Sequence, residues 1–309
     1  YIENNPDELK ENKIDTIRRK IQFYKEYLEE TARQEKRTRP ESLVVIISDT
    51  HFGRRTWSYE DPEKIDFNSE VAKKRIKYLE RGILRIYTIL KKSYDFKGIY
   101  ILFLGDIIDG ELTFPVQQFH IDKPEFEQIV SAADVLGNLI DSLKNKIGKV
   151  YLRGVWGNHA HNPKMHDLNR GDMLLYEFLK REYEKDPQVD VEFSKQFFQV
   201  VEIEKHGFLL YHGMSIRSYL GIPFYGIGKW GARRIKTLPK GWDYLILGHF
   251  HQLNYLNYPG FEVYMNGTLV SSDPYSLERF GVDGDNRFWL LSVHEERGIT
   301  FQYKINTRG

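Results

Sequence analysis

Gly248-His249-Phe250-His251 directly follows the apolar run Tyr244-Leu245-Ile246-Leu247. Four consecutive apolar residues before a glycine are typical of a buried strand. The two histidines therefore stand two positions apart, immediately beyond a strand end. Two imidazoles in that place are a poor way to fill a core, but they can present nitrogen ligands to metal ions at the edge of a sheet. The stretch predicts a metal site at a strand end.

Four other apolar runs in the chain end in residues of the same kind. A lone motif of this type is most often a turn, a helix cap or a hydrogen-bonded core histidine. Five in series, each after a β-type run, favour a common site, and a glycine beside each of the last four lets the backbone turn sharply near a ligand. The runs and the residues that follow them are Leu43–Ser48 with Asp49 and His51, Ile99–Leu104 with Asp106 and Asp109, Lys149–Arg153 with Asn158 and His159, and Phe208–Tyr211 with His212.

The order of these motifs resembles that of the calcineurin-like metallophosphoesterases, in which D-x-H, G-D-x-x-D, G-N-H, H-G and G-H-x-H follow one another. The resemblance covers residues 43 to about 270. It is closest to the branch that contains the double-strand-break-repair exonucleases and their phage-encoded relatives. The stretches that look most like this branch are Ser48-Asp49-Thr50-His51-Phe52-Gly53, Gly105-Asp106-Ile107-Ile108-Asp109-Gly110 and Asn266-Gly267-Thr268.

The resemblance implies an α/β fold, a four-layer αββα sandwich with two mixed β-sheets (the metallophosphoesterase fold). The residues alone support α/β layering with several hairpins, because β-type runs alternate with helix-favouring segments. The sequence predicts helices over 70–93, 124–146 and 171–184 and strands at 261–265, 288–293 and 299–305. It also predicts a hairpin of strands 191–203 and 207–211 around His206-Gly207.

The resemblance also implies a role for each strand-end residue. Two metal ions close together can activate a water and neutralise phosphoryl charge. The expected cofactor is two divalent transition metal ions, with Mn first and Fe, Zn or Ni as alternatives, because imidazole, carboxylate and amide ligands suit these metals. Asp49, His51 and His251 would hold one ion, Asn158, His212 and His249 the other, and Asp106 would bridge them. His159 would donate a proton to the leaving oxygen, and Asp109 would orient a ligand.

Ala160 departs from the pattern of this family, which usually has Asp or Glu directly after Gly-Asn-His. Either another group orients His159, or its role as an acid is weaker. We expect that an acid restored by Ala160→Asp would raise activity if the loop geometry allows it. The nearby His161 is interpreted as a loop histidine.

Basic and aromatic residues near the motifs are candidates for substrate binding. Arg54 and Arg55 come just after the first ligands, and a basic, aromatic segment lies between His212 and His249. That segment is either a solvated helix with a few packing aromatics or a wall that contacts phosphates and stacks on bases. We favour the wall, because metal ligands tether both ends. Its candidate residues are Arg217, Tyr225, Arg233 and Arg234.

We expect residues 1–40 to be a charged N-terminal helix, for docking or as a linker, and the resemblance implies a metallophosphoesterase domain over residues 41–309, including the β-rich C-terminal part. Residues 7–38 are charged and helix-favouring, with apolar residues at positions 14, 17, 21, 24 and 28. A helix docked on the domain is the favoured interpretation. An oligomer seam, or a linker to an N-terminal module that precedes Tyr1, is the alternative.

Composition limits the classes of function. The 309 residues include 41% hydrophobic residues, enough for a substantial core, and the net charge is only +1. Contacts with nucleic acid must therefore come from local patches. No cysteine is present, which fits a reducing cytoplasm. The sequence also contains no run of 18 apolar residues, as a membrane-spanning helix would need, and no signal peptide.

The expected function is metal-dependent hydrolysis of phosphodiesters in DNA, as an exonuclease or endonuclease. A phosphatase or a nucleotide phosphodiesterase would use the same metals. A non-catalytic binding module is a further alternative, although all seven ligand positions are filled. The chain could also be the metal-binding subunit of a larger DNA-processing complex, with the N-terminal helix as the contact with a protein partner.

Overall fold

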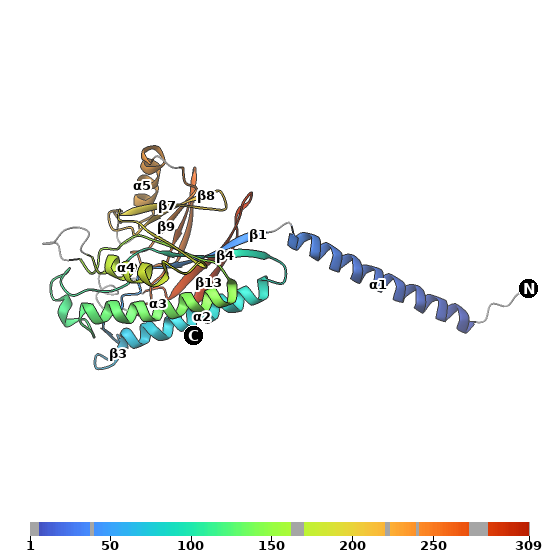
Figure 1. Cartoon of the computed structure of the whole chain (residues 1–309), viewed down its shortest axis with the longest axis horizontal. Coiled ribbons are helices and arrows are strands. Elements are labelled where there is room, and N and C mark those ends of the chain that lie inside the picture. The colour runs from blue at the N-terminus through green and yellow to red at the C-terminus, as the bar shows by residue number, and fades with distance from the viewer. Residues whose placement is uncertain are drawn as a thin grey trace, which may run out of the picture.

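The computed structural model describes residues 6–37, 40–161, 170–219, 223–238, 241–271 and 284–308. Two β-sheets lie face to face in it (Figure 1). The first sheet is mixed, since β12 is antiparallel to its neighbours whereas β1, β4, β5 and β6 are parallel. Its strands, in spatial order, are β13 (Gly298–Asn306), β12 (Arg287–His294), β1 (Pro40–Ile47), β4 (Asp95–Phe103), β5 (Val150–Gly154) and β6 (Val189–Phe193).

The second sheet has three parallel central strands and an antiparallel strand at each edge. Its strands, in spatial order, are β10 (Asn254–Tyr258), β11 (Phe261–Met265), β9 (Tyr244–Leu247), β8 (His206–Tyr211) and β7 (Phe198–Ile203). Because parallel strands end on the same edge, β8 and β9 deliver the residues that follow them to one place.

Alternating side chains of β1 show how the layers pack. Val44 and Ile46 point between the two sheets, where they join Phe208 and Ile246 of the second sheet. Val45 and its alternate neighbours point to the opposite face, under the helices. A strand buried on both faces must be apolar throughout, which is why β1 appears in the sequence as a continuous hydrophobic run.

Helices cover both outer faces. The first sheet carries α2 (Ser69–Leu90), α3 (Glu125–Ile147) and α4 (Gly171–Tyr183), and the second carries α5 (Phe224–Thr237), whose Ile227 is fully buried against it (Figure 1). The predicted four-layer αββα sandwich with two mixed sheets is therefore confirmed. The three predicted helices are confirmed to within a few residues.

Some sequence predictions were wrong in detail. The predicted strand 191–203 is two strands in different sheets, β6 and β7, separated by a short turn. The hairpin turn lies at Glu204 and Lys205, both with positive φ, and His206 begins β8. The sequence also missed β10, the short pair β2 (Thr56–Trp57) and β3 (Ile65–Phe67), and a 3-10 turn at Gln117–Phe119.

Helix α1 (Pro6–Arg37) does not dock on the domain, so the favoured interpretation of its apolar face was wrong. It projects away from the sandwich (Figure 1), and its stripe is exposed, from 50% at Ile14 to 63% at Leu28. The helix precedes the start of β1, whereas the predicted ligands follow the end of that strand. The eight residues of β1 span about 26 Å, and this length separates the end of α1 from the predicted ligands.

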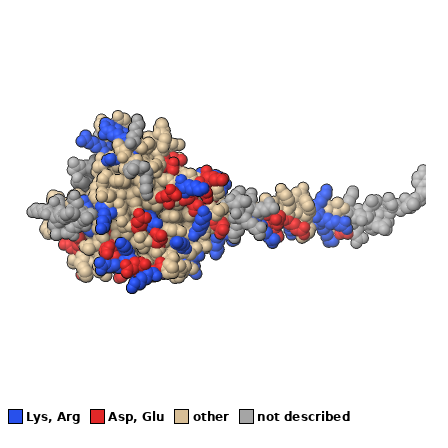
Figure 2. All heavy atoms as spheres, turned by 45° about the horizontal axis from the view of Figure 1, so that its top comes forward, with Lys and Arg blue, Asp and Glu red and all other residues tan. Residues whose placement is uncertain are grey.

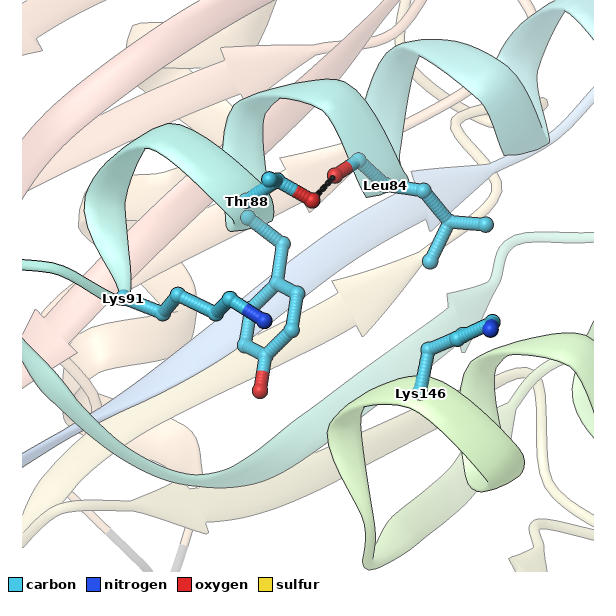
Figure 3. A pocket seen from close by; sticks show the side chains of 5 residues that line it. Leu84, Thr88, Lys91 and Lys146 are labelled. Carbon is cyan, nitrogen blue, oxygen red and sulfur yellow. Dashed lines mark hydrogen bonds between the residues drawn. The ribbon is translucent and has the colours of Figure 1, made fainter.

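A shallow depression lies between the C-terminal end of α2 and α3 (Figure 3). Ser69, the first residue of α2, bonds the backbone of Gly53 near the strand-end loops. The depression starts fifteen residues further along, roughly 22 Å at the rise of an α-helix, so it lies away from those loops. It is lined by Leu84, Tyr87, Thr88, Lys91 and Lys146. None of the described helices is long and apolar enough to cross a membrane.

Candidate metal centre

The seven predicted metal ligands all lie in loops that directly follow parallel strands. The loops after β1, β4 and β5 come from the first sheet, and those after β8 and β9 come from the second. Backbone hydrogen bonds join these loops to one another, as between Asp49 N–H and the Gly105 carbonyl at 3.1 Å. The edges of both sheets thus meet at one site.

Five of the seven ligands have a left-handed backbone. The φ angles are 51° at Asp49, 45° at His51, 51° at Asp106, 67° at His249 and 55° at His251. A side chain at positive φ costs about 1–3 kcal/mol, and such residues cluster at functional sites. Each of these loops therefore turns immediately after its strand and aims its ligand across the strand ends.

Asp49, His51 and His251 form one ligand cluster. The Nε2 atoms of His51 and His251 lie 3.2 Å apart, and His251 Nε2 lies 3.3 Å from Asp49 Oδ1. Asp49 also accepts hydrogen bonds from the backbone N–H of His249, which ties it to the loop of the other sheet. Two ring nitrogens and a carboxylate oxygen converging within contact distance fit a transition metal ion.

Asp106, His212 and His249 form a second cluster. His212 Nε2 lies 3.1 Å from Asp106 Oδ2 and 2.9 Å from Asn158 Oδ1, so the amide oxygen of Asn158 joins this cluster. The seven predicted ligands are thus brought together as two groups. Asp106 lies in the second of them, and its bridging role remains a prediction.

The histidine tautomers favour metal binding. The Nδ1 atom of His212 donates to the Leu104 carbonyl at 2.7 Å, and that of His51 lies 2.9 Å from Asp109 Oδ1. Partners on Nδ1 fix the ring and leave Nε2 directed into the site, which is how proteins commonly orient metal-binding imidazoles. Asp109 therefore lies where a residue that orients His51 should lie.

The buried acids and histidines of the site shift one another's pKa values. Burial opposes ionisation of Asp106, but the His212 and His159 imidazoles outweigh it and hold the pKa of Asp106 well below its usual value. Burial likewise opposes protonation of His212, but Asp106 outweighs it and raises the pKa of His212 to about 9. Burial and the His212 imidazole lower the pKa of His249 to about 4. Metal binding at His212 would therefore release a proton.

His159 is held by two carboxylates. Its Nδ1 lies 3.2 Å from Asp109 Oδ1, and its backbone N–H donates to Asp106 Oδ1 at 2.7 Å. Burial lowers the pKa of His159, but Asp106 and Asp109 outweigh it, so the pKa is raised. Asp109 therefore lies where the acid absent at position 160 would be expected to act on His159, and this one carboxylate contacts both His51 and His159.

Ala160 leaves no space for an acid, so the condition on which Ala160→Asp was expected to raise activity is not met. The residue is 2% exposed and has a φ of 49°. Gly110 and Gly171 pack so closely on it that a Cβ on either would lie within 3.0 Å of Ala160 atoms. A carboxylate here would clash and would be buried beside Asp109, so Ala160→Asp is expected to disrupt the loop.

Asp172 is a site residue that the sequence did not reveal. It accepts hydrogen bonds from the backbone N–H groups of Asp106 at 2.9 Å, Ile107 at 3.0 Å and Gly157 at 2.9 Å. Burial, with the Asp106 charge, raises the pKa of Asp172 to about 6. Its carboxylate thereby fixes the loop of Asp106 to the loop that carries Asn158 and His159.

Asp172→Asn is expected to weaken metal binding by about 10–100-fold, the usual cost of losing a partner behind the ligands. An amide has one acceptor oxygen, so at least one of the three backbone N–H groups would face an NH₂ group instead. Titration calorimetry with Mn²⁺ measures the loss, and Asp134→Asn on the exposed face of α3 is the control. Wild-type affinity of Asp172→Asn for Mn²⁺ would contradict the proposal that Asp172 holds the ligand loops in position.

The predicted substrate residues divide into two groups. Arg54 lies beside the site, with its guanidinium 3.6 Å from Asp109 Oδ1, whereas the Arg55 guanidinium lies over the Trp57 ring and donates to the Phe119 carbonyl. The others lie on or before α5 in the outer layer, and no described contact joins them to the ligands. The Arg234 guanidinium packs 5.1 Å from the centre of the Trp230 ring, whereas Arg217, Tyr225 and Arg233 are exposed. His161 lies in a loop, where its backbone bonds Thr113.

Several solved structures are similar to this chain. Vps29 from Entamoeba histolytica complexed with zinc has 14% sequence identity over 85% of this chain and 99% of that chain, with a TM-score of 0.39. A novel archaeal phosphodiesterase has 15% identity over 85% of this chain and 98% of that chain, with a TM-score of 0.37. Yfce, a phosphoesterase from E. coli, has 13% identity over 85% and 100% of the two chains, with a TM-score of 0.34.

No known family model matches the chain, and no curated protein matches it. The assignment of the site therefore rests on this chain's own residues. These are seven convergent residues able to bind metal, which follow parallel strands, and the imidazole of His159, which lies 3.2 Å from the Asp109 carboxylate.

Proposed function

We propose that this protein hydrolyses phosphoesters with two divalent metal ions. The observation that carries the proposal is the meeting of two ligand clusters with His159, an imidazole whose pKa two carboxylates raise. Such ions, when bound, neutralise charge on the phosphoryl group and activate a water. Asp49, His51 and His251 would hold one ion, and Asn158, His212 and His249 the other, with Asp106 between them.

The other residues of the site would act on the substrate or on the ligands. His159 would donate a proton to the leaving oxygen, and Asp109 would keep that imidazole and His51 in position. Arg54, whose guanidinium lies beside Asp109, would contact a phosphoryl oxygen. A fixed imidazolium and a fixed guanidinium favour the transition state because they need no reorganisation as charge develops.

We further propose that the substrate is a phosphodiester of DNA and that the metal is manganese. The sequence resemblance to DNA-repair exonucleases and the arginine and aromatic residues beside the site support this substrate. Figure 2 shows acidic and basic side chains interspersed over much of the visible face, with a basic group where α5 lies. A phosphatase or a nucleotide phosphodiesterase remains the second candidate, because it needs the same ligands.

Turnover of four substrates tests the proposal. These are bis-p-nitrophenyl phosphate, p-nitrophenyl phosphate, and labelled single- and double-stranded DNA, each with Mn²⁺, Zn²⁺, Ni²⁺ or Fe²⁺ and with chelator. We expect chelator-sensitive hydrolysis of the diester and of DNA, fastest with Mn²⁺. Preference for the monoester would favour a phosphatase. The absence of turnover with every metal would overturn the enzymatic proposal.

Charge reversal at Arg217 and Arg233 is expected to weaken activity on DNA far more than on bis-p-nitrophenyl phosphate. Both side chains are exposed, so their replacement leaves the core intact. Contacts with DNA phosphates release counterions, so the wild-type activity on DNA should also fall more steeply with salt than activity on the small diester. Arg85→Glu, on the exposed face of α2, is the control. Equal losses on both substrates would show that α5 and the segment before it, which carries Arg217, do not bind DNA.

We propose that α1 contacts a protein partner with acidic flanks. Arg18, Lys20 and Lys25 border the exposed apolar stripe, so two copies of α1 paired through it would place like charges opposite one another. A partner helix with acidic residues beside its apolar stripe would relieve this repulsion. Light scattering distinguishes pairing of two copies of α1 from binding of a different partner. A homodimer held by α1 would contradict the proposal. The stripe consists of Ile14, Ile17, Ile21, Tyr24 and Leu28.

A further inference from the structure

An apolar, aromatic rim borders the candidate metal centre on the side of His159. It consists of residues 54–57, which end in β2, and residues 112–120, which include the 3-10 turn, and the two segments bond each other, as Arg55 N–H does to the His120 carbonyl at 2.8 Å. Large apolar side chains are exposed on it, among them Leu112 at 60% and Phe119 at 63%. An exposed apolar group beside a charged site is a common mark of a binding surface.

Phe114 is the rim residue whose ring lies against the His159 imidazole. The centre of its ring lies 4.7 Å from that of the His159 imidazole, with the planes inclined by 57°. The side chain is nevertheless 43% exposed, so much of the ring is open to solvent. If the leaving oxygen of a substrate contacts His159, the chemical group attached to that oxygen would lie on the Phe114 ring.

The backbone around Phe114 is fixed to the catalytic loops. Buried Gln117 accepts hydrogen bonds from the N–H groups of Thr113 at 2.8 Å and Phe114 at 3.1 Å. The Gln117 amide donates in turn to the Asp109 carbonyl at 2.6 Å. Thr113 also bonds the backbone of His161, two residues beyond His159. A surface ring held this firmly loses little entropy when a ligand stacks on it.

Cations accompany the rings of the rim. Arg54 lies 3.6 Å from Asp109, and the Arg55 guanidinium lies 5.0 Å from the centre of the Trp57 ring, which in turn contacts His120. A ligand that suits this surface carries a flat π-system attached to an anion. Nucleotides have both, and stacking of bases on aromatic residues beside a positive groove is the usual way in which single strands are bound.

We propose that Phe114 is a stacking platform for the nucleobase next to the scissile phosphate of a single-stranded polynucleotide. The proposal rests on the function proposed above and specifies its substrate class. Stacking of a base on an aromatic residue contributes about 1–3 kcal/mol by alanine substitution, which corresponds to roughly 5- to 150-fold in affinity. Phe114 would thereby select substrates that carry a base at this position over substrates that do not.

Binding in the presence of chelator tests the platform without hydrolysis. The probes are fluorescein-labelled (dT)10 and an abasic decamer with the same phosphates, measured by fluorescence anisotropy. We expect Phe114→Ala to weaken (dT)10 binding about 5- to 150-fold and to leave the abasic decamer unchanged. Phe114→Trp should retain the wild-type affinity, and Phe126→Ala, an exposed ring on α3, is the matched control.

Turnover with Mn²⁺ adds a second readout, in which Phe114→Ala should raise the KM for the dinucleotide TpT and leave kcat near wild type. Equal losses on both decamers, or a loss confined to kcat, would overturn the proposal and make Phe114 a residue that positions His159. Wild-type affinity of Phe114→Ala for (dT)10 would overturn it too, as would dTMP competing as well as (dT)10. Base-dependent binding without any hydrolysis would instead contradict the proposed function and leave the platform supported.

Discussion

Asp106→Asn is expected to lose metal and activity together. Its carboxylate lies 3.1 Å from His212 Nε2 and accepts the backbone N–H of His159, so it joins the second cluster to the loop of His159. An amide keeps the shape but removes the charge that two cations would share. We expect the loss of metal affinity to exceed the roughly 10–100-fold that a partner behind the ligands contributes.

The measurement is elemental analysis of the purified variant, with turnover of bis-p-nitrophenyl phosphate measured in parallel. The fold should survive, since Asp106 follows the end of β4 and the apolar core lies between and beneath the sheets. A melting temperature close to that of Asp134→Asn would show this. Two ions retained per chain would rule out Asp106 as the carboxylate shared by both clusters.

The convergence of the seven candidate ligands could be predicted because the motifs that carry them are local in sequence. Each ligand stands within a few residues of an apolar run, and parallel strands bring such positions to one edge. His249 and His251 illustrate this, since the strand, the glycine and both imidazoles fall within eight residues. Which sheet carries each strand was not needed, because two sheets that face each other bring both edges to the same site.

Asp172, which lies behind the candidate ligands, could not be predicted in the same way, although Asp109 could, because it directly follows the motif of Asp106. Asp172 stands in the first turn of α4, where an acid is ordinary because it faces the positive end of the helix dipole. Its hydrogen-bond partners lie 66, 65 and 15 positions upstream. Only the packing of α4 against the strand ends brings them together, and no pattern in the sequence expresses that packing.

The wrong predictions have a similar physical origin. The apolar stripe on α1 indicates that this face packs against another surface. Its periodicity does not identify that surface, because it is the same whether the helix packs on this domain or on another chain. The run 191–203 contains neither Gly nor Pro, and only the polar triplet Ser194-Lys195-Gln196 marks the turn that separates β6 from β7. The length of 13 residues, which exceeds that of an ordinary strand, was a second sign that the run could serve two sheets.

His159→Ala is expected to keep both metals and to slow turnover according to the leaving group. General acid catalysis is typically worth about 10²–10⁴-fold. The loss should be largest on DNA, whose 3′- or 5′-oxygen leaves poorly without a proton, and small for p-nitrophenolate. Asp109, 3.2 Å from His159 Nδ1, orients the imidazole in place of the acid missing at position 160. That contact favours a loss within the usual range rather than below it.

Wild type and His159→Ala should be compared on DNA and on bis-p-nitrophenyl phosphate, with metal content measured in both proteins. Asp109→Asn is the informative companion, because it weakens the hold on His159 and also on His51. It should therefore lose metal affinity as well as rate, whereas His159→Ala should lose rate alone. The same fold-loss on both substrates for His159→Ala would contradict proton donation, and the raised pKa of His159 would then serve to hold the phosphate by its charge.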